Sequence, residues 1–139
     1  MTTKKLPRGI RNNNPLNIRL TKDRWVGRKP NQTDKAFFEF VSMPYGIRAA
    51  CIILRKYIRK YGCNTIKSII SKWAPANENN TTAYIDRVSK AMHQSSNDAI
   101  DYQNEAMMCE LIHAMAVVEN GGDYVDKNTI LLGYRLAGK

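Results

Sequence analysis

Hydrophobic residues recur at intervals of three and four along most of the chain after residue 46, which is the spacing of one buried helix face. The pattern predicts helices over residues 47–61, 65–73, 83–92, 98–119 and 126–137. Gly62 and Pro75 follow the first two of these and are typical helix stops. We expect Asn64 to cap the second helix and Thr81 or Thr82 to cap the third.

The first 46 residues lack this periodicity. Residues 12–15, Asn-Asn-Asn-Pro, indicate a turn, because asparagine tolerates left-handed backbone and proline restricts φ. Residues 17–20 and 25–28 suit short strands or extended loops, and residues 36–41 alternate like a strand about Glu39. The expected fold class is mostly α (α+β), with a small extended or β region near the N-terminus. One domain covers residues 11–139, and a flexible basic leader covers residues 1–10.

Composition is typical of one globular domain. The chain has 139 residues, of which 43% are hydrophobic, enough for a core and too many for general disorder. No stretch approaches the roughly 18 apolar residues needed to span a bilayer. The basic N-terminus has no apolar segment and so does not resemble a secretory signal. A function outside the cytoplasm would therefore need another route of delivery.

The formal net charge of +10 favours polyanionic partners, either nucleic acid or a bacterial envelope. No helix-turn-helix, RNA-recognition or zinc motif is recognisable, and aromatic residues do not interleave with basic ones, so nucleic acid is not the expected partner. Three widely spaced cysteines and two histidines lack metal-ligand spacing, and no phosphate-binding glycine motif is present. We therefore expect no metal and no cofactor.

Glu119 is the candidate catalytic residue. It follows a strongly apolar run, residues 111–118, at the C-terminal end of a predicted helix. Apolar neighbours and the negative end of the helix dipole both disfavour its ionisation and raise its pKa. A carboxylic acid that stays protonated near neutral pH is what cleavage of a glycosidic bond requires. The local pattern alone is equally compatible with a glutamate that ends a helix in solvent.

Two further segments have the composition of a sugar site. Residues 73–84 combine aromatic, amide and hydroxyl side chains in a loop between helices, with Glu78 as a nearby carboxylate. Residues 11–19 contain four asparagines, and Trp25 follows. Rings stack on the apolar faces of sugars, while amides and hydroxyls bind sugar hydroxyl and N-acetyl groups. The alternative is an ordinary polar loop in which Trp73 and Tyr84 are core residues.

Taken together, these segments resemble a family of small phage and prophage structural or lytic proteins. The shared motifs, in order, are Arg-Gly-Ile-Arg-Asn-Asn-Asn-Pro (8–15), Asn-Ile-Arg (17–19), Trp-Val-Gly (25–27), Phe-Glu-Phe (38–40), Gly-Ile-Arg-Ala (46–49), Trp-Ala-Pro (73–75), Glu-Asn-Asn-Thr-Thr-Ala-Tyr-Ile (78–85) and Glu-Asn-Gly-Gly (119–122). The resemblance spans residues 8 to about 136. Leu16 departs from it, because glycine is more usual there.

That family is similar to the lysozyme and lytic transglycosylase superfamily, with its elements apparently circularly permuted. In ordinary members the catalytic glutamate lies on the first helix, whereas here the Glu-Asn-Gly-Gly helix comes near the end of the chain. The resemblance implies a lysozyme-like catalytic domain that cleaves peptidoglycan between N-acetylmuramic acid and N-acetylglucosamine. It places Tyr84 close to Glu119, which acts as the general acid and base.

A transglycosylase needs only this glutamate, whereas a hydrolase would use a second carboxylate about 5–9 Å away. Glu78 is the first choice for that role; Glu39, expected to be exposed, is the second. The expected substrate-binding residues are Asn14, Asn17, Trp25, Trp73, Asn79, Thr81 and Tyr84.

The resemblance implies an enzyme carried in a phage virion, or an endolysin held in the host cytoplasm before release, that acts in the periplasm or cell wall. Its partners would be glycan strands, with the anionic envelope and phage tail or virion proteins as further candidates. The alternative function is non-catalytic: a virion structural protein, or a nucleic-acid-binding protein, on a lysozyme-like scaffold.

Overall fold

A computed structural model describes residues 5–76 and 80–138. Within these residues the chain is mostly helical. Its helices are α1 (Arg8–Arg11), α2 (Met43–Arg59), α3 (Ile66–Trp73), α4 (Thr81–Met92), α5 (Glu105–Asn120) and α6 (Lys127–Leu136). No helix of this described part is long and apolar enough to cross a membrane.

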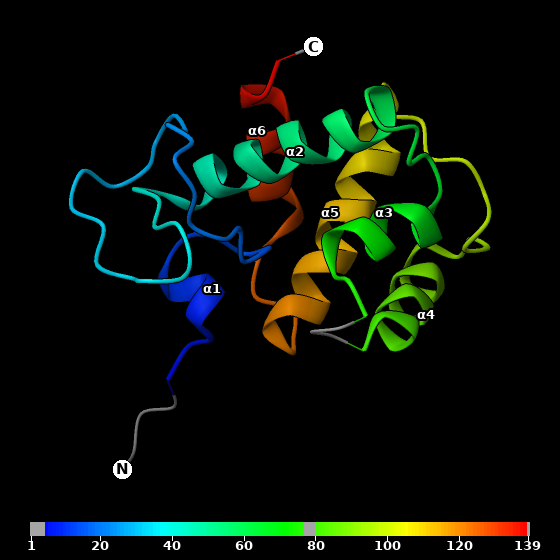
Figure 1. Ribbon diagram of the computed structural model, residues 1–139, viewed down its shortest axis with the longest axis horizontal. Coiled ribbons are helices and arrows are strands. Elements are labelled where there is room, and N and C mark those ends of the chain that lie inside the picture. Colours follow the sequence, from blue (N-terminus) through cyan, green and yellow to red (C-terminus); the bar gives the residue numbers. More distant parts are fainter. Residues whose placement is uncertain (1–4, 77–79, 139) are drawn as a thin grey trace.

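Helix α5 is the centre of the fold. Its apolar residues Met108, Leu111, Ile112 and Met115 are fully buried. Helix α4 packs against one side of α5 and α3 packs on α4, while α6 packs against both α2 and α5. Figure 1 shows α2 crossing the top of the molecule in front of α6, with the N-terminal loops on the opposite side from α3 and α4. The C-terminal end of α5 therefore lies between the N-terminal loops and the α3–α4 pair.

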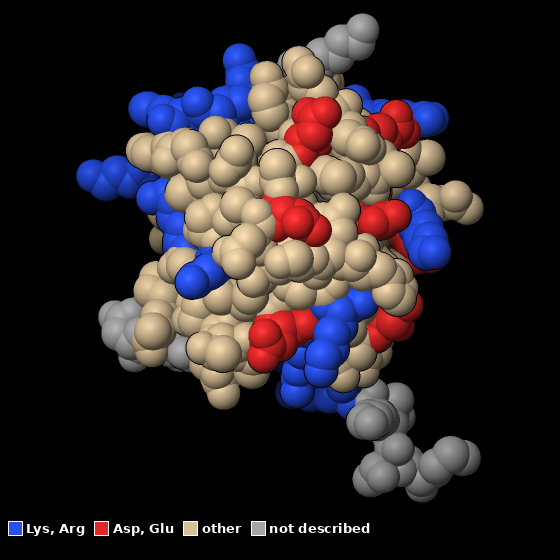
Figure 2. All heavy atoms as spheres, turned by 90° about the vertical axis from the view of Figure 1, so that its right-hand side faces the viewer, with Lys and Arg blue, Asp and Glu red and all other residues tan. Residues whose placement is uncertain are grey.

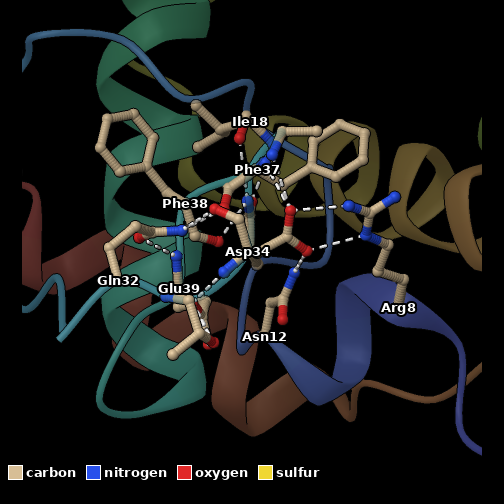
Figure 3. A network of polar contacts seen from close by, with 11 residues as sticks. Arg8, Asn12, Ile18, Gln32, Asp34, Phe37, Phe38 and Glu39 are labelled. Carbon is tan, nitrogen blue, oxygen red and sulfur yellow. Dashed lines mark hydrogen bonds and ion pairs between the residues drawn. The ribbon is translucent and has the colours of Figure 1, made fainter.

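The N-terminal region is extended, as expected, but in the described residues it forms only isolated bridges, Arg19 with Phe37 and Arg28 with Phe40. The leader expected over residues 1–10 is too long. Residues 8–10 belong to α1, and Arg8 forms an ion pair of 2.7 Å with Asp34. Asn12 donates a further hydrogen bond to Asp34 (Figure 3). These contacts lower the pKa of Asp34 well below its usual range.

Glu39 corrects a second expectation. Its alternation with two buried phenylalanines predicted an exposed side chain, yet Glu39 is only 7% exposed. The loop before it folds over the carboxylate, and Thr33 and Asp34 donate hydrogen bonds to it. Burial acts to raise the pKa of Glu39, but these hydrogen bonds outweigh it and the pKa is lowered. The Glu39 carboxylate therefore stabilises the loop that contains Thr33 and Asp34.

The helix boundaries differ from the expected ones where capping or tertiary bonds decide them. Thr65 caps α3 in a capping box with Ser68, so Asn64 is not the cap, and Asn80 rather than a threonine caps α4. The long helix was expected from residue 98, but α5 starts at 105 after its cap Asn104. The backbone of Ile100 instead donates a 2.7 Å bond to the Asn64 carbonyl, which keeps residues 98–103 out of the helix. The last helix forms as expected.

Candidate active site

Glu119 lies in the last turn of α5, where the chain turns away through Gly121 at φ 66°. Asn17 Nδ2 donates to one carboxylate oxygen of Glu119 over 2.9 Å, and the Tyr84 hydroxyl donates to the other over 2.9 Å. The side chain of Trp73 lines the same hollow as this carboxylate and lies near enough to act on its pKa. Segments far apart in the sequence therefore converge on one carboxyl group.

The asparagine-rich turn delivers Asn17. Asn13 and Asn17 both adopt φ of 53°, a left-handed conformation that asparagine tolerates well. Asn14 is fully buried, and its amide donates to the carbonyl oxygens of Ile18 and Phe38 over 3.0 and 2.9 Å. Asn14 was expected to bind substrate. Its side chain is instead occupied in bracing the turn and has no access to a ligand.

The same turn is docked onto the end of α5. Asn120 donates one hydrogen bond to the Pro15 carbonyl and another to Ala116, each 2.8 Å long. A Cβ atom on Gly9 would lie 2.6 Å from Asn120 Oδ1 and 2.8 Å from Asn17 Oδ1, distances that real Cβ atoms do not adopt. Only glycine lets α1 approach this closely. The motif over residues 8–15 therefore acts mainly as a clamp that holds Asn17 against Glu119.

Tyr84 and Trp73 approach from the other side. Tyr84 is in the first turn of α4 and is 5% exposed, with its ring in the core. Trp73 is the last residue of α3, and its ring meets that of Tyr57 on α2 edge to face, with centroids 6.1 Å apart. Because α3 packs on α4 and α4 on α5, these helix contacts set where both side chains meet Glu119.

The electrostatics of the site favour a protonated glutamate that can still ionise. Burial raises the pKa of Glu119, while the hydrogen bonds from Asn17 and Tyr84, the nearby Trp73 side chain and the charge of Arg19 act to lower it. The net direction is upward. Burial and the neighbouring Glu119 also raise the pKa of Tyr84, so its hydroxyl remains a donor. The result is a carboxyl group with both oxygens hydrogen-bonded.

Glu119 lines two hollows of the surface. One, of about 510 Å³, lies toward α2 and the N-terminal loops and is lined by Asn17, Ile18, Arg19, Thr21, Asp23, Phe37, Ile53, Tyr57, Lys72, Trp73, Ala74, Pro75 and Glu119. The other, of about 400 Å³, is lined by Asn80, Ala83, Tyr84, Arg87, Val118 and Glu119. A third hollow shares Asp23, Ile53, Tyr57 and Lys72 with the first and continues it to Trp25. Glu119 thus lies along an extended cleft.

The expected site residues divide into three groups. Asn17, Trp73 and Tyr84 contact Glu119. Trp25 lies in the continuation of the cleft, and the Thr81 hydroxyl donates to the Ala74 carbonyl, bridging the ends of the loop between α3 and α4. Glu78 and Asn79 lie outside the described residues.

Sequence reasoning did not single out several residues of the cleft wall. Tyr57 and Lys72 lie on neighbouring helices, and Asp23 and Thr21 on an exposed loop. Among the described residues, this hollow is lined by two carboxylates, Glu119 and Asp23. No local pattern marks these residues, because only the packing of α2, α3 and the N-terminal loops brings them together. The described residues hold no cluster of three or more histidine, cysteine or acidic side chains suited to a metal ion.

Comparison with known proteins finds a phage relative. No protein-family model matches the sequence. The chain is 38% identical over 130 residues to a protein named Protein P5 of Pseudoalteromonas phage PM2, an alignment that covers 91% of this chain and 79% of that protein.

Proposed function

The chain belongs to the family of Protein P5 of Pseudoalteromonas phage PM2, and we propose that it is an enzyme that cuts the glycan strands of peptidoglycan. The bond cleaved joins N-acetylmuramic acid to N-acetylglucosamine, and Glu119 is the general acid. One observation carries the proposal: a glutamate with a raised pKa, hydrogen-bonded through both oxygens, lines an extended cleft. The phage relative is consistent with a lytic role but says nothing about activity.

The surroundings of Glu119 suit a group that gives up a proton and later takes one back. Burial raises the pKa of the carboxyl group and so favours the protonated form, which can donate a proton to the leaving oxygen. Once it is ionised, Asn17 and Tyr84 donate hydrogen bonds to the new carboxylate and hold it in place. The carboxylate can then remove a proton either from water or from the muramic C6 hydroxyl, the second route giving a 1,6-anhydro product.

Glu119 lines two hollows, and the first of them is continued toward Trp25, which suits a polymeric substrate. Trp73 and Tyr57 offer ring faces for sugars, and Asn17 and Asn80 offer amide groups. We also propose that the fold is a circularly permuted lysozyme-like domain, with α5 in the role of the first helix. The support for this is the catalytic-type glutamate at a helix end that faces both extended loops and a tyrosine-bearing helix.

The choice between transglycosylase and hydrolase depends on a second carboxylate. Glu39 is excluded, because Thr33 and Asp34 occupy it away from the cleft. Asp23 lines the same hollow as Glu119 and is a candidate. Glu78 keeps its place as a candidate on the sequence alone. The enzyme would reach the wall either within the virion or as a lysis protein, with its net charge of +10 favouring the anionic envelope.

The test is release of muropeptides from purified sacculi, identified by mass. We expect the wild-type protein to release fragments and Glu119→Gln to lower the rate by about a hundredfold or more, the usual contribution of a general acid. Glu110→Gln is the matched control, because Glu110 lies on the same helix but is exposed. Anhydro ends would indicate a transglycosylase and reducing ends a hydrolase.

Absence of release by the wild type, or equal release by Glu119→Gln, would contradict the proposal. It would favour a structural protein of the virion on the same scaffold.

A further inference from the structure

A second basic feature lies on α2, away from Glu119. Arg55, Lys56, Arg59 and Lys60 line a hollow of about 550 Å³ whose other lining residues are Ile52 and Ala137. In the described part of the chain, none of these four cations has a carboxylate within ion-pair distance. Like charges one helical turn apart repel each other. The hollow is therefore a concentrated positive site without a counter-charge from these residues.

The basic side of α2 is not simply a solvated helix face, because one of its cations, Arg55, is buried, with only 9% of the residue exposed. Nη1 makes one long hydrogen bond, 3.4 Å, to the Ala137 carbonyl, and the guanidinium lies over the Tyr134 ring at 5.0 Å. Its Nε atom is buried and has no acceptor among the described residues. A buried guanidinium normally has a carboxylate or several strong acceptors, because its desolvation is costly.

The other side of Arg55 offers no free acid. Arg55 and Arg59 also line a hollow of about 710 Å³ together with Tyr102, Gln103, Glu105, Tyr134, Arg135 and Gly138. Glu105 is the acidic residue here, and Arg135 already pairs with it at 3.0 Å. Arg59 lies over the Tyr102 ring at 5.4 Å. The two arginines, one helical turn apart, thus lie between two hollows, and neither has a carboxylate partner among residues 5–76 and 80–138.

We propose that Arg55 and Arg59, with Lys56 and Lys60, form a binding site for a phosphate group. A guanidinium fork matches two oxygens of a phosphate and binds them more strongly than neutral acceptors. Four cations call for more negative charge than one carboxylate carries, which favours phosphate. The ligand is either free phosphate or the phosphate of a lipid headgroup. The site does not depend on the chemistry at Glu119, since none of its residues lines either hollow beside that carboxyl group, and Lys56 alone also lines the continuation toward Trp25.

Both signs of charge are present on the face that Figure 2 shows. Lysine and arginine side chains lie along its upper left and upper right edges and also lower down, and acidic side chains lie near the top as well as in the middle and lower part. The upper end is where α2 and α6 lie in Figure 1. The concentration of positive charge therefore belongs to the hollow of Arg55, Lys56, Arg59 and Lys60 and not to the whole face.

The test is phosphate binding by the whole protein, measured by titration calorimetry and by thermal unfolding in phosphate or chloride at equal ionic strength. The main variant is Arg59→Gln/Lys60→Gln, since both side chains are exposed and their replacement leaves the core intact. The matched control is Lys67→Gln/Lys90→Gln, which removes two exposed cations from α3 and α4. We expect phosphate to stabilise the wild type and the control. Affinity should fall about tenfold or more in the main variant, the size expected for a lost charge-assisted contact.

Arg55→Met is the second variant. It should also lose phosphate binding, while its stability in chloride should be kept, because replacing an unpaired buried charge with an apolar side chain is often neutral or stabilising. Flotation with phosphatidylglycerol vesicles, compared with phosphatidylcholine vesicles, distinguishes the source. If the wild type binds the anionic vesicles and the main variant does not, the ligand of the site is a lipid headgroup. If the wild type binds phosphate but not the vesicles, the ligand is free phosphate. Equal responses to phosphate in the wild type and in either variant would overturn the proposal.

Discussion

Replacing Tyr84 by phenylalanine isolates one hydrogen bond of the site. The hydroxyl donates to Glu119 over 2.9 Å, and the ring is 5% exposed between α4 and the core. Phenylalanine keeps the ring and its packing but leaves one Glu119 oxygen without this donor. The change therefore tests whether the ionised carboxylate is stabilised by neighbouring side chains rather than by solvent.

The expected cost depends on the charge of Glu119. A hydrogen bond to a charged group contributes about 1.5–3 kcal/mol, against about 0.5–1.5 kcal/mol for a neutral pair. Because the Tyr84 bond lowers the pKa of Glu119, its removal should raise that pKa further. The free energy of unfolding should thus fall most at pH values where Glu119 is ionised in the wild type. At acidic pH, where Glu119 is protonated in both proteins, the difference in the free energy of unfolding should decrease toward the contribution of a hydrogen bond between neutral groups.

The measurement is urea unfolding of both proteins across a series of pH values, beside the pH dependence of muropeptide release. Tyr124→Phe is the matched control, because Tyr124 is 45% exposed and its loss should change the free energy by less than about 0.5 kcal/mol. The limb of the activity profile on which Glu119 loses its proton should shift to higher pH in Tyr84→Phe. A loss that is the same at every pH, or no loss at all, would refute the coupling between Tyr84 and the ionised Glu119.

Two further predictions concern stability. Gly9→Ala should lower the free energy of unfolding by about 1–3 kcal/mol in urea and reduce muropeptide release, because the new Cβ would displace Asn120 and Asn17. Gly122→Ala is the control, because a Cβ there meets only the Tyr124 ring. A Gly9→Ala variant as stable as the wild type would contradict the role of Gly9 in docking the turn onto α5. Above the ordinary glutamate pKa of about 4.3, Glu119 loses its proton in the unfolded chain but keeps it in the folded protein, where its pKa is raised. As the pH rises through this range, the free energy of unfolding of the wild type should therefore fall by up to about 1.4 kcal/mol per pH unit relative to Glu119→Gln. Unfolding across pH measures this, and a constant difference would show that Glu119 is not shifted.

The positions of α2 to α6 were largely predictable from the sequence because each carries its own apolar period. Helix α1 was not predicted, and α2 begins at Met43, before the expected residue 47. The start of α5 was not predictable either, since Ile100 continues the apolar pattern although its backbone bonds to Asn64 in a distant loop. Glu39 was misjudged for the same reason. Alternation with its neighbours cannot reveal that Thr33 and Asp34 fold over it. Tertiary hydrogen bonds, invisible to a local pattern, decided both cases.

The candidate site was predictable in part. Glu119 was singled out because its local signals, an apolar helix and two following glycines, lie next to it in the sequence. Choosing among the asparagines was beyond a sequence pattern, since Asn14 and Asn17 differ only in which way the turn points them. Tyr57 and Lys72 gave no signal, because each belongs to the cleft only through helix packing.

Most of the motif residues at the N-terminus build the site rather than bind a ligand. Gly9 and Asn14 are occupied by packing and hydrogen bonds within the protein, Asn120 at the end of α5 holds the same turn through the Pro15 carbonyl, and Asn17 donates to Glu119 directly. The carboxyl group is held by donors from two separate segments, and the same donors oppose the effect of burial on its pKa. Loosening either segment would therefore change both the position and the acidity of Glu119. In the proposed enzyme, folding and chemistry are linked in this way, so substitutions far from the cleft, such as at Gly9, should alter activity through the proton affinity of one glutamate.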